Sequence, residues 1–344
     1  YDESIINVFC EFWSPSGEYF KVYAFYYQDF VKTNQNCTPY PCEVLNSNNE
    51  YCWKIRFTPD EIGKWQYKLT AADNSGSITY PSSSLLNFKC ISSSNLGFIT
   101  KANNKFLKRT SGQFYFPVGE NLAWYNSPDF WGQQTFGTNE FIYYIDKLAN
   151  NKVNFIRVFL DVYEGMALVG YDYTSQTNYY NLYNQKDAFQ LDQIINYAKT
   201  KDVNIMLCLF SHASWGDSSY CNNNWSTKNP FYEQNNGPLT TPFEFFTNNS
   251  AISATKKMIK SIVSRWGFAT NIVSWELWNE VNEIKKFNSS LTPPITFEND
   301  IYNWHLSMYN YIKSLDPFNH LITSSNSGDS IISANSIYSI MDYS

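Results

Sequence analysis

The chain has 344 residues, which is more than one ordinary domain needs and enough for two. Its formal net charge is −6 and its lysines and arginines are scattered, which argues against nucleic acid or an anionic membrane surface as a partner. No apolar run approaches the length that spans a bilayer, so no membrane insertion is expected. Aromatic residues make up 19% of the chain, and because this exceeds what a core needs, we expect some of them to line a carbohydrate cleft.

Residues 1–95 have the pattern of a small all-β domain. Segments 8–13 and 19–26 are rich in β-forming residues and are separated by a Pro-Ser-Gly turn, and segment 51–57 alternates between apolar and polar residues. Short strands between turns predict an Ig-like β-sandwich. The polar run 92–95 is the predicted linker, which places the domain boundary after residue 95.

From residue 96 to residue 344 the sequence predicts an α/β barrel of the TIM type. Apolar segments typical of buried parallel strands alternate with segments whose apolar residues recur at helical spacing. The predicted strands are 113–121, 153–159, 203–210, 272–280, 320–324 and 337–342. The predicted helices are 138–150, 187–198, 251–266 and 298–315. Since six strands are found, the (β/α)8 barrel is expected to be incomplete after about strand six.

Cysteines and glycosylation motifs indicate a secreted, extracellular or cell-surface protein. The chain begins at Tyr1 without a methionine, as expected if a signal peptide has been removed. Cys208 lies inside an apolar run and is expected to be reduced. Up to three disulfides, with open connectivity, are expected among Cys10, Cys37, Cys42, Cys52, Cys90 and Cys221. The predicted glycosylation sites are Asn36, Asn224, Asn248 and Asn288.

The three histidines are His212, His305 and His320, and they are not spaced with the cysteines as zinc ligands. No metal and no cofactor is therefore expected. The strongest candidate for chemistry is instead the segment 275–280, which reads Trp-Glu-Leu-Trp-Asn-Glu and ends the fourth predicted barrel strand. A carboxylate at the C-terminal tip of a buried parallel strand lies where α/β barrels place catalytic groups. The alternative is a core strand that ends in a surface glutamate.

Four further residues are candidates for substrate binding. Arg157 interrupts an apolar strand and needs a buried carboxylate or several acceptors; it has either a role at the site or a structural ion pair with Glu276. His212 and Trp215 follow the third barrel strand, at the end where barrels deliver active-site groups, although a lone histidine is as often a satisfied core residue. Trp124 follows the first barrel strand and either floors a subsite or packs within its loop.

The barrel segments resemble those of a known family. Residues 265–267 and 275–280 resemble the fourth strand of clan A glycoside hydrolases, the retaining cellulase- and mannanase-like β-glycanases on (β/α)8 barrels. Residues 243–251 resemble the segment before that strand, and residues 57–67 resemble the small Ig-like domain that precedes the barrel in secreted members.

The resemblance implies a role for three residues of this chain. It implies that Glu280 is the general acid/base, that Asn279 binds the 2-hydroxyl group of the sugar, and that Arg157 hydrogen-bonds the nucleophile. In the family the nucleophile is a glutamate at the end of strand seven, so here it is expected beyond residue 344.

Two classes of function remain open. The first is a retaining glycoside hydrolase that acts on β-linked poly- or oligosaccharides in its full-length form. Because the nucleophile is not found, the 344-residue chain alone is expected to be inactive, with the missing strands supplied by a continuation or by another protein. The second is a non-catalytic extracellular glycoprotein that uses the barrel for glycan binding or structural assembly.

Overall fold

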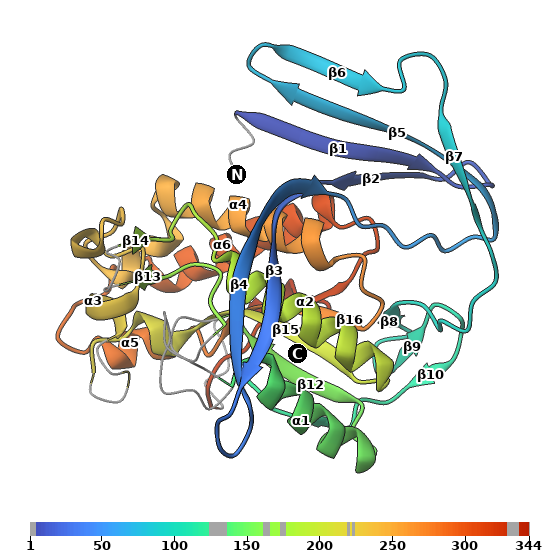
Figure 1. The fold of residues 1–344 in the computed structure, drawn as a ribbon. Coiled ribbons are helices and arrows are strands. Elements are labelled where there is room, and N and C mark those ends of the chain that lie inside the picture. Colours follow the sequence, from blue (N-terminus) through green and yellow to red (C-terminus); the bar gives the residue numbers. More distant parts are fainter. Residues whose placement is uncertain are drawn as a thin grey trace.

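A computed structural model describes residues 5–123, 136–160, 166–172, 177–218, 221, 224–328 and 337–343 (Figure 1). From residue 5 to residue 90 it contains strands and loops and no helix. Five strands form an antiparallel sheet in the order β2-β1-β5-β6, with β7 paired to β5: β1 (Ile6–Trp13), β2 (Tyr19–Tyr23), β5 (Gly63–Asp73), β6 (Gly76–Tyr80) and β7 (Leu86–Cys90). The prediction of an all-β N-terminal region is confirmed, while its Ig-like topology and its boundary at residue 95 stay predictions.

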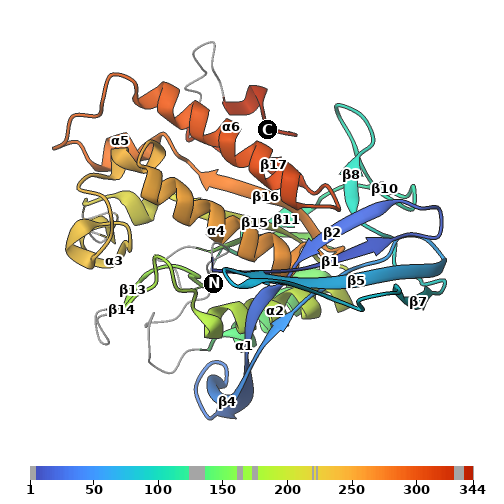
Figure 2. The same ribbon diagram turned by 90° about the horizontal axis from the view of Figure 1, so that it is seen from above.

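The strands β3 (Phe25–Gln35) and β4 (Cys42–Lys54) form a separate antiparallel hairpin. The hairpin leaves the first sheet and runs along the helices α1 (Thr138–Asn150) and α2 (Gln185–Thr200) (Figures 1 and 2). Phe25, Tyr27 and Phe30 of β3 are buried in one cluster with Phe189 of α2. The N-terminal strands are therefore packed directly onto the second half of the chain.

The second half is built on a five-stranded parallel sheet whose strands follow chain order. They are β11 (Gly119–Glu120), β12 (Phe155–Phe159), β15 (Asn204–Ser211), β16 (Ile272–Asn279) and β17 (Leu321–Thr323). The helices α1, α2, α4 (Asn249–Trp266) and α6 (Phe297–Leu315) alternate with these strands. The predicted alternation of parallel strands and helices in a TIM-type region is confirmed.

The first predicted barrel strand has wrong bounds, and the predicted strand at 337–342 is not a strand in the structure. Residues 114–115 belong to a small antiparallel sheet, so the first barrel strand is limited to residues 119–120. Segment 337–342 begins with a 3-10 turn whose Ile337 side chain is buried in the core. It does not pair as a strand with β17, because a single backbone bond joins them, from the Asp342 N–H to the Ile322 carbonyl at 2.9 Å. The small sheet comprises β8 (Ile99–Lys101), β9 (Leu107–Arg109) and β10 (Phe114–Tyr115).

Short elements occupy the long connections of the second half. They are the strand pair β13 (Tyr171–Asp172) and β14 (Thr177–Asn178) and the helices α3 (Asn224–Lys228) and α5 (Glu283–Phe287). None of the helices in the described ranges combines the length and the apolar composition that a membrane span requires.

A cluster of charged residues joins the N-terminal strands to the barrel helices. Arg56, just after β4, donates from Nη1 and Nη2 to the carboxylate of Asp192 on α2, at 2.7 and 2.9 Å. Arg265 of α4 donates to the same carboxylate from Nη2 at 2.8 Å, and Trp266 donates from Nε1 at 2.8 Å. Burial alone would raise the pKa of Asp192, but the Arg265 and Arg56 charges outweigh it and hold this pKa below its usual value.

Glu43 of the hairpin supplies the N-terminal cap that α1 lacks in its own sequence. The N-cap residue of α1 is Gly137, which has no side chain to accept a hydrogen bond. The buried Glu43 carboxylate instead accepts from the Thr138 N–H at 2.9 Å, from the Thr138 hydroxyl at 2.6 Å and from Gln190 Nε2 at 2.7 Å. A carboxylate at a helix N-terminus satisfies orphan donors and opposes the helix dipole favourably.

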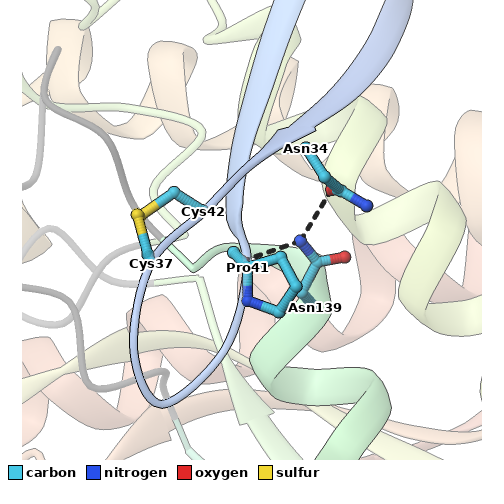
Figure 3. The surroundings of a disulfide bond; sticks show 5 residues. All are labelled: Asn34, Cys37, Pro41, Cys42 and Asn139. Atoms are coloured by element: carbon cyan, nitrogen blue, oxygen red, sulfur yellow. Dashed lines mark hydrogen bonds between the residues drawn. A yellow bond between two sulfur atoms is a disulfide. The ribbon is translucent and has the colours of Figure 1, made fainter.

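The tip of the hairpin is tied to α1 by a second set of contacts (Figure 3). Asn139 Nδ2 donates to Asn34 Oδ1 and to the Pro41 carbonyl, each at 2.9 Å. The Cys37–Cys42 disulfide closes the loop that carries Pro41 and follows the strand of Asn34. The helix that follows the first barrel strand is thus held by the N-terminal hairpin at its first turn.

The expectation of up to three disulfides is wrong for most of the cysteines, all of which lie in the described ranges. Cys37 and Cys42 are bonded, whereas Cys10, Cys52 and Cys90 are free thiols and Cys221 is reduced. The physical reason is that these cysteines lie far apart: Cys52 is on the hairpin and Cys221 in the second half. Cys10 and Cys90 share the first sheet, but they lie opposite Leu69 and Gly63, six residues apart along β5. Cys208 is reduced as predicted, and its thiol donates to the Phe210 carbonyl at 3.2 Å.

Two of the four predicted glycosylation sites are wrong because their side chains are inside the protein. Asn224 and Asn288 are 0% and 3% exposed, and Asn288 Nδ2 donates to the Trp215 carbonyl at 2.7 Å. An amide nitrogen buried in this way has no room for a glycan. Asn36 is exposed, and Asn248 caps α4 through its Oδ1, which accepts from Ser250 N at 2.9 Å and leaves Nδ2 outside that contact. These two sites stay predictions.

Candidate active site

Glu280 marks the carboxyl end of β16, a strand in which every residue is buried. Its backbone φ is 55°, in the left-handed region that non-glycine residues seldom adopt. The Glu280 N–H donates to the Ser325 hydroxyl at 3.2 Å, and the side chain is 38% exposed. The carboxylate therefore leaves the strand at the end of the parallel sheet and reaches solvent, in an uncommon backbone conformation of the kind that clusters at functional sites.

His212 lies beside Glu280. It begins a 3-10 turn (His212–Trp215) directly after β15, and its Nδ1 is 3.2 Å from Glu280 Oε2. Its ring stacks on Phe287 of α5, with centroids 5.3 Å apart and an interplanar angle of 19°. Burial lowers the pKa of His212, although the nearby Glu280 charge acts in the opposite direction. The imidazole is consequently neutral at neutral pH and lies 3.2 Å from the carboxyl group of Glu280.

Arg157 holds the amide of Asn279 in one orientation. Its Nη2 donates to Asn279 Oδ1 at 2.7 Å, and its Nε and Nη2 donate to the two oxygens of Glu276 at 2.6 and 2.5 Å. Because an arginine can only donate, the atom of Asn279 that faces it must be the oxygen. Asn279 Nδ2 then points towards His212, 3.4 Å from Nδ1, and offers a donor at the edge of the site. Of the two roles foreseen for Arg157, the structure shows the ion pair with Glu276.

The loop after β17 braces the same end of β16, and sequence reasoning missed it. The Ser325 N–H donates to the Trp278 carbonyl at 2.9 Å, while the Ser325 hydroxyl receives the Glu280 N–H. Asn282 Nδ2 donates to Ser327 Oγ at 3.0 Å, and the Ser327 N–H donates back to Asn282 Oδ1 at 2.8 Å. The polar run 324–327, directly after a predicted barrel strand, is the sequence signal that could have identified this loop.

The tryptophans near the site are buried in the core. Trp215 is 1% exposed and packs against Trp225, Phe245 and Trp278, so the expectation that it binds substrate is wrong. Trp275 and Trp278 are both fully buried as well. Trp275 packs against His320 and Trp278 against Trp304, so neither ring is available to a sugar. Trp124 lies outside the described residues.

The described residues bring together Glu280, Asn279, His212 and Arg157 from three neighbouring strands. Within the described ranges, no group of three or more His, Cys, Asp or Glu side chains is arranged to hold a metal ion. The site offers one part-exposed carboxyl group, a neutral imidazole in contact with it and an oriented amide donor. That set can transfer a proton to or from a bound molecule while the amide holds one of its hydroxyl groups.

Comparison with protein families decides the membership of this chain. Residues 114–339 match the model for cellulase, glycosyl hydrolase family 5. The chain belongs to glycosyl hydrolase family 5. The family 5 region includes β16 and the loop after β17, and therefore contains the whole cluster around Glu280. Residues 5–72 match a domain of unknown function, DUF5060.

Curated relatives of this chain include fungal mannanases. Mannan endo-1,4-beta-mannosidase F of Aspergillus fumigatus is 28% identical over 139 residues, which cover 40% of this chain and 26% of that enzyme. Mannan endo-1,4-beta-mannosidase A of Hypocrea jecorina is 34% identical over 109 residues, which cover 31% of this chain and 22% of that enzyme. The match thus spans about a quarter of the length of these relatives.

A solved structure extends the likeness to the whole fold. A candidate glycoside hydrolase from Bacteroides vulgatus superposes with a TM-score of 0.61 at 14% identity, covering 95% of this family 5 chain and 53% of that chain. At this identity the likeness concerns the fold alone. It shows that the N-terminal strands and the barrel region occur together in a second protein.

Proposed function

We propose that the protein is a retaining glycoside hydrolase for β-linked glycans, with Glu280 as its general acid/base. The observation that carries the proposal is the place of Glu280: a part-exposed carboxylate in a left-handed backbone conformation at the carboxyl end of a buried family 5 strand. In retaining hydrolysis such a group first protonates the departing glycosidic oxygen and then removes a proton from the attacking water.

The other residues of the cluster have supporting roles in this proposal. Asn279 donates from Nδ2 to a sugar hydroxyl, which the family resemblance identifies as the 2-hydroxyl, because Arg157 fixes its oxygen on the opposite side. His212 holds the Glu280 carboxyl group in place through its Nδ1 and remains neutral, so that it does not trap Glu280 in a permanent ion pair. Arg157 acts as a positioning residue, since its donors are directed at Glu276 and Asn279.

A retaining mechanism also requires a second carboxylate about 5 to 5.5 Å from the acid/base, as the nucleophile. Glu276 does not serve, because Arg157 donates to both of its oxygens and its side chain is 2% exposed. A mechanism-based label that traps the glycosyl-enzyme in the full-length protein identifies the nucleophile directly, and we expect the label on a carboxylate other than Glu276 and Glu280.

For the substrate we propose a β-1,4-linked mannan, the glycan named in the curated relatives. We also propose an extracellular or cell-surface location. The Cys37–Cys42 disulfide supports it, because disulfides persist mainly in oxidising compartments.

The proposal is tested with Glu280→Gln in the full-length protein. For aryl β-mannosides with basic leaving groups we expect kcat/KM to fall by about 100-fold or more, because protonation of the leaving oxygen is lost. For activated leaving groups the fall should be much smaller. The matched control is Glu298→Gln, an exposed carboxylate at the start of α6, which should leave both substrates unaffected.

Equal losses for both substrate types in Glu280→Gln contradict the role of acid/base. If the wild-type full-length protein binds mannan and hydrolyses neither substrate, the alternative of a non-catalytic glycan-binding glycoprotein is favoured instead.

A further inference from the structure

The two faces of the β3–β4 hairpin differ in what they contact. On the inner face Phe25, Tyr27 and Phe30 are at most 7% exposed and pack with Phe189 of α2. The inner face and the Glu43 cap attach the hairpin to the barrel helices. The outer face is therefore not needed for this attachment.

The outer face carries an aromatic cluster made of the exposed Tyr26 and Tyr51 and the half-buried Trp53. Tyr26 lies opposite Trp53 in the register, and Tyr51 lies opposite Gln28, two residues along on the same side. The Tyr26 ring is 6.2 Å from the Tyr51 ring at an interplanar angle of 18°, and 5.8 Å from the Trp53 ring. Tyr26 and Tyr51 nevertheless remain 39% and 50% exposed. Single exposed aromatics need no explanation, but adjacent exposed rings indicate a binding surface.

The chemistry of this cluster fits a sugar chain. Tyrosine and tryptophan present flat C–H-binding faces together with a polar group at the ring edge. Gln28, opposite Tyr51, donates from Nε2 to the Ser47 hydroxyl at 2.9 Å, which places an amide and a hydroxyl group beside the rings. A sugar chain likewise alternates apolar C–H faces with hydroxyl groups. By contrast, the exposed pair Phe106 and Phe114, 5.8 Å apart, has no polar atoms in its side chains.

We propose that this outer face, built on Tyr26, Tyr51, Trp53 and Gln28, is a glycan-binding site distinct from the cluster around Glu280. The class of glycan, a β-linked polysaccharide, rests on the proposed function. Since the hairpin is fixed to α1 by Glu43 and Asn139, a chain bound to it is held at a constant position relative to the barrel. Such a second contact raises the effective concentration of the polysaccharide near the barrel without any change in chemistry.

The test is affinity electrophoresis of the full chain in gels that contain soluble β-mannan. Tyr51→Ala and Tyr26→Ala should each weaken mannan binding by about tenfold, which corresponds to the loss of one stacked ring. The matched control is Tyr80→Ala, a tyrosine on β6 that is 65% exposed and lies away from the cluster, and it should migrate as the wild type does. Because all three side chains are exposed, thermal unfolding of the variants should match the wild type and exclude misfolding.

Glu280→Gln in the same gels separates this site from the proposed catalytic function. We expect Glu280→Gln to keep the mannan retardation and its dependence on Tyr51, even if the hydrolysis assays refute the acid/base role. The hairpin site is refuted if Tyr26→Ala and Tyr51→Ala bind mannan as tightly as the wild type does. It is equally refuted if neither β-mannan nor a soluble β-glucan retards the wild type.

Discussion

The carboxylates at the joint between the N-terminal strands and the barrel differ in exposure from the Glu280 carboxylate at the carboxyl end of the parallel sheet, here called the rim. At the joint, Asp192 and Glu43 are 4% and 1% exposed, and each accepts several hydrogen bonds from arginine, tryptophan, threonine or glutamine donors. At the rim, Glu280 meets the neutral His212 and keeps 38% of its side chain exposed. A carboxylate saturated with donors stabilises the fold, whereas a part-exposed one remains available for proton transfer.

The largest expected effect is at the joint. Asp192→Asn removes one charge from the Arg56–Asp192–Arg265 cluster and should lower the free energy of unfolding by about 3 to 5 kcal/mol, because the buried Arg265 and the part-exposed Arg56 lose their charged partner. Denaturant unfolding measures this change. The matched control is Asp202→Asn, whose carboxylate also pairs with an arginine at 2.7 Å but is 74% exposed, and it should cost less than about 1 kcal/mol. Similar losses in the two variants would contradict a special role for the joint.

The pH dependence of stability should distinguish the joint from the barrel. The pKa of Asp192 is below its usual 3.8, so its stabilising effect is complete above pH 3.8 and is lost as the pH falls through the lower folded-state value. Burial lowers the pKa of His305 on α6 from 6.5 to about 4, so its neutral form stabilises the fold above pH 6.5 and that effect is lost between pH 6.5 and 4. The free energy of unfolding should be measured as a function of pH for both variants and the wild type. Between pH 6.5 and 4 it should fall less in His305→Gln than in the wild type. Below pH 4 it should fall less in Asp192→Asn than in the wild type.

A smaller effect is expected from the cap on α1. Glu43→Gln keeps the shape of the side chain but removes its charge from the first turn of the helix and from Lys32, 3.3 Å away, and should cost about 1 to 2 kcal/mol. Glu50→Gln, an exposed glutamate on the same strand, should change stability by less than about 0.5 kcal/mol. Equal stability of the two variants in urea would show that the hairpin does not cap α1.

The sequence predicted the features that depend on local pattern. Apolar strands that alternate with amphipathic helices identified the parallel sheet, since strands buried on both faces are apolar nearly throughout. The pair Asn279-Glu280 was found because it ends a strand, where barrels deliver their polar groups. The same reasoning placed His212 near it, whereas Arg157 was identified as a charge inside an apolar strand. The structure brings all four residues together.

Features that depend on contacts between distant segments could not be predicted. Trp215 follows a strand just as a cleft residue would, and its burial comes from Phe245 and Trp278, which belong to other segments. The contact between Ser325 and Glu280 depends on how β17 pairs with β16. The charged joint depends on the docking of the N-terminal strands onto the barrel helices. Nothing in the sequence around Arg56 indicates that its partner is Asp192.

The most direct test of the central claim is chemical rescue of Glu280→Ala in the full-length protein. With an activated aryl β-mannoside the glycosyl-enzyme should still form, because its leaving group needs no proton, but its hydrolysis should be slow without a general base. Azide needs no base and should attack from the face that Glu280 vacates, so we predict a rise in turnover with azide concentration and a β-mannosyl azide as the product. An α-mannosyl azide, or turnover equal to the wild type without azide, would contradict the assignment of Glu280 as the acid/base.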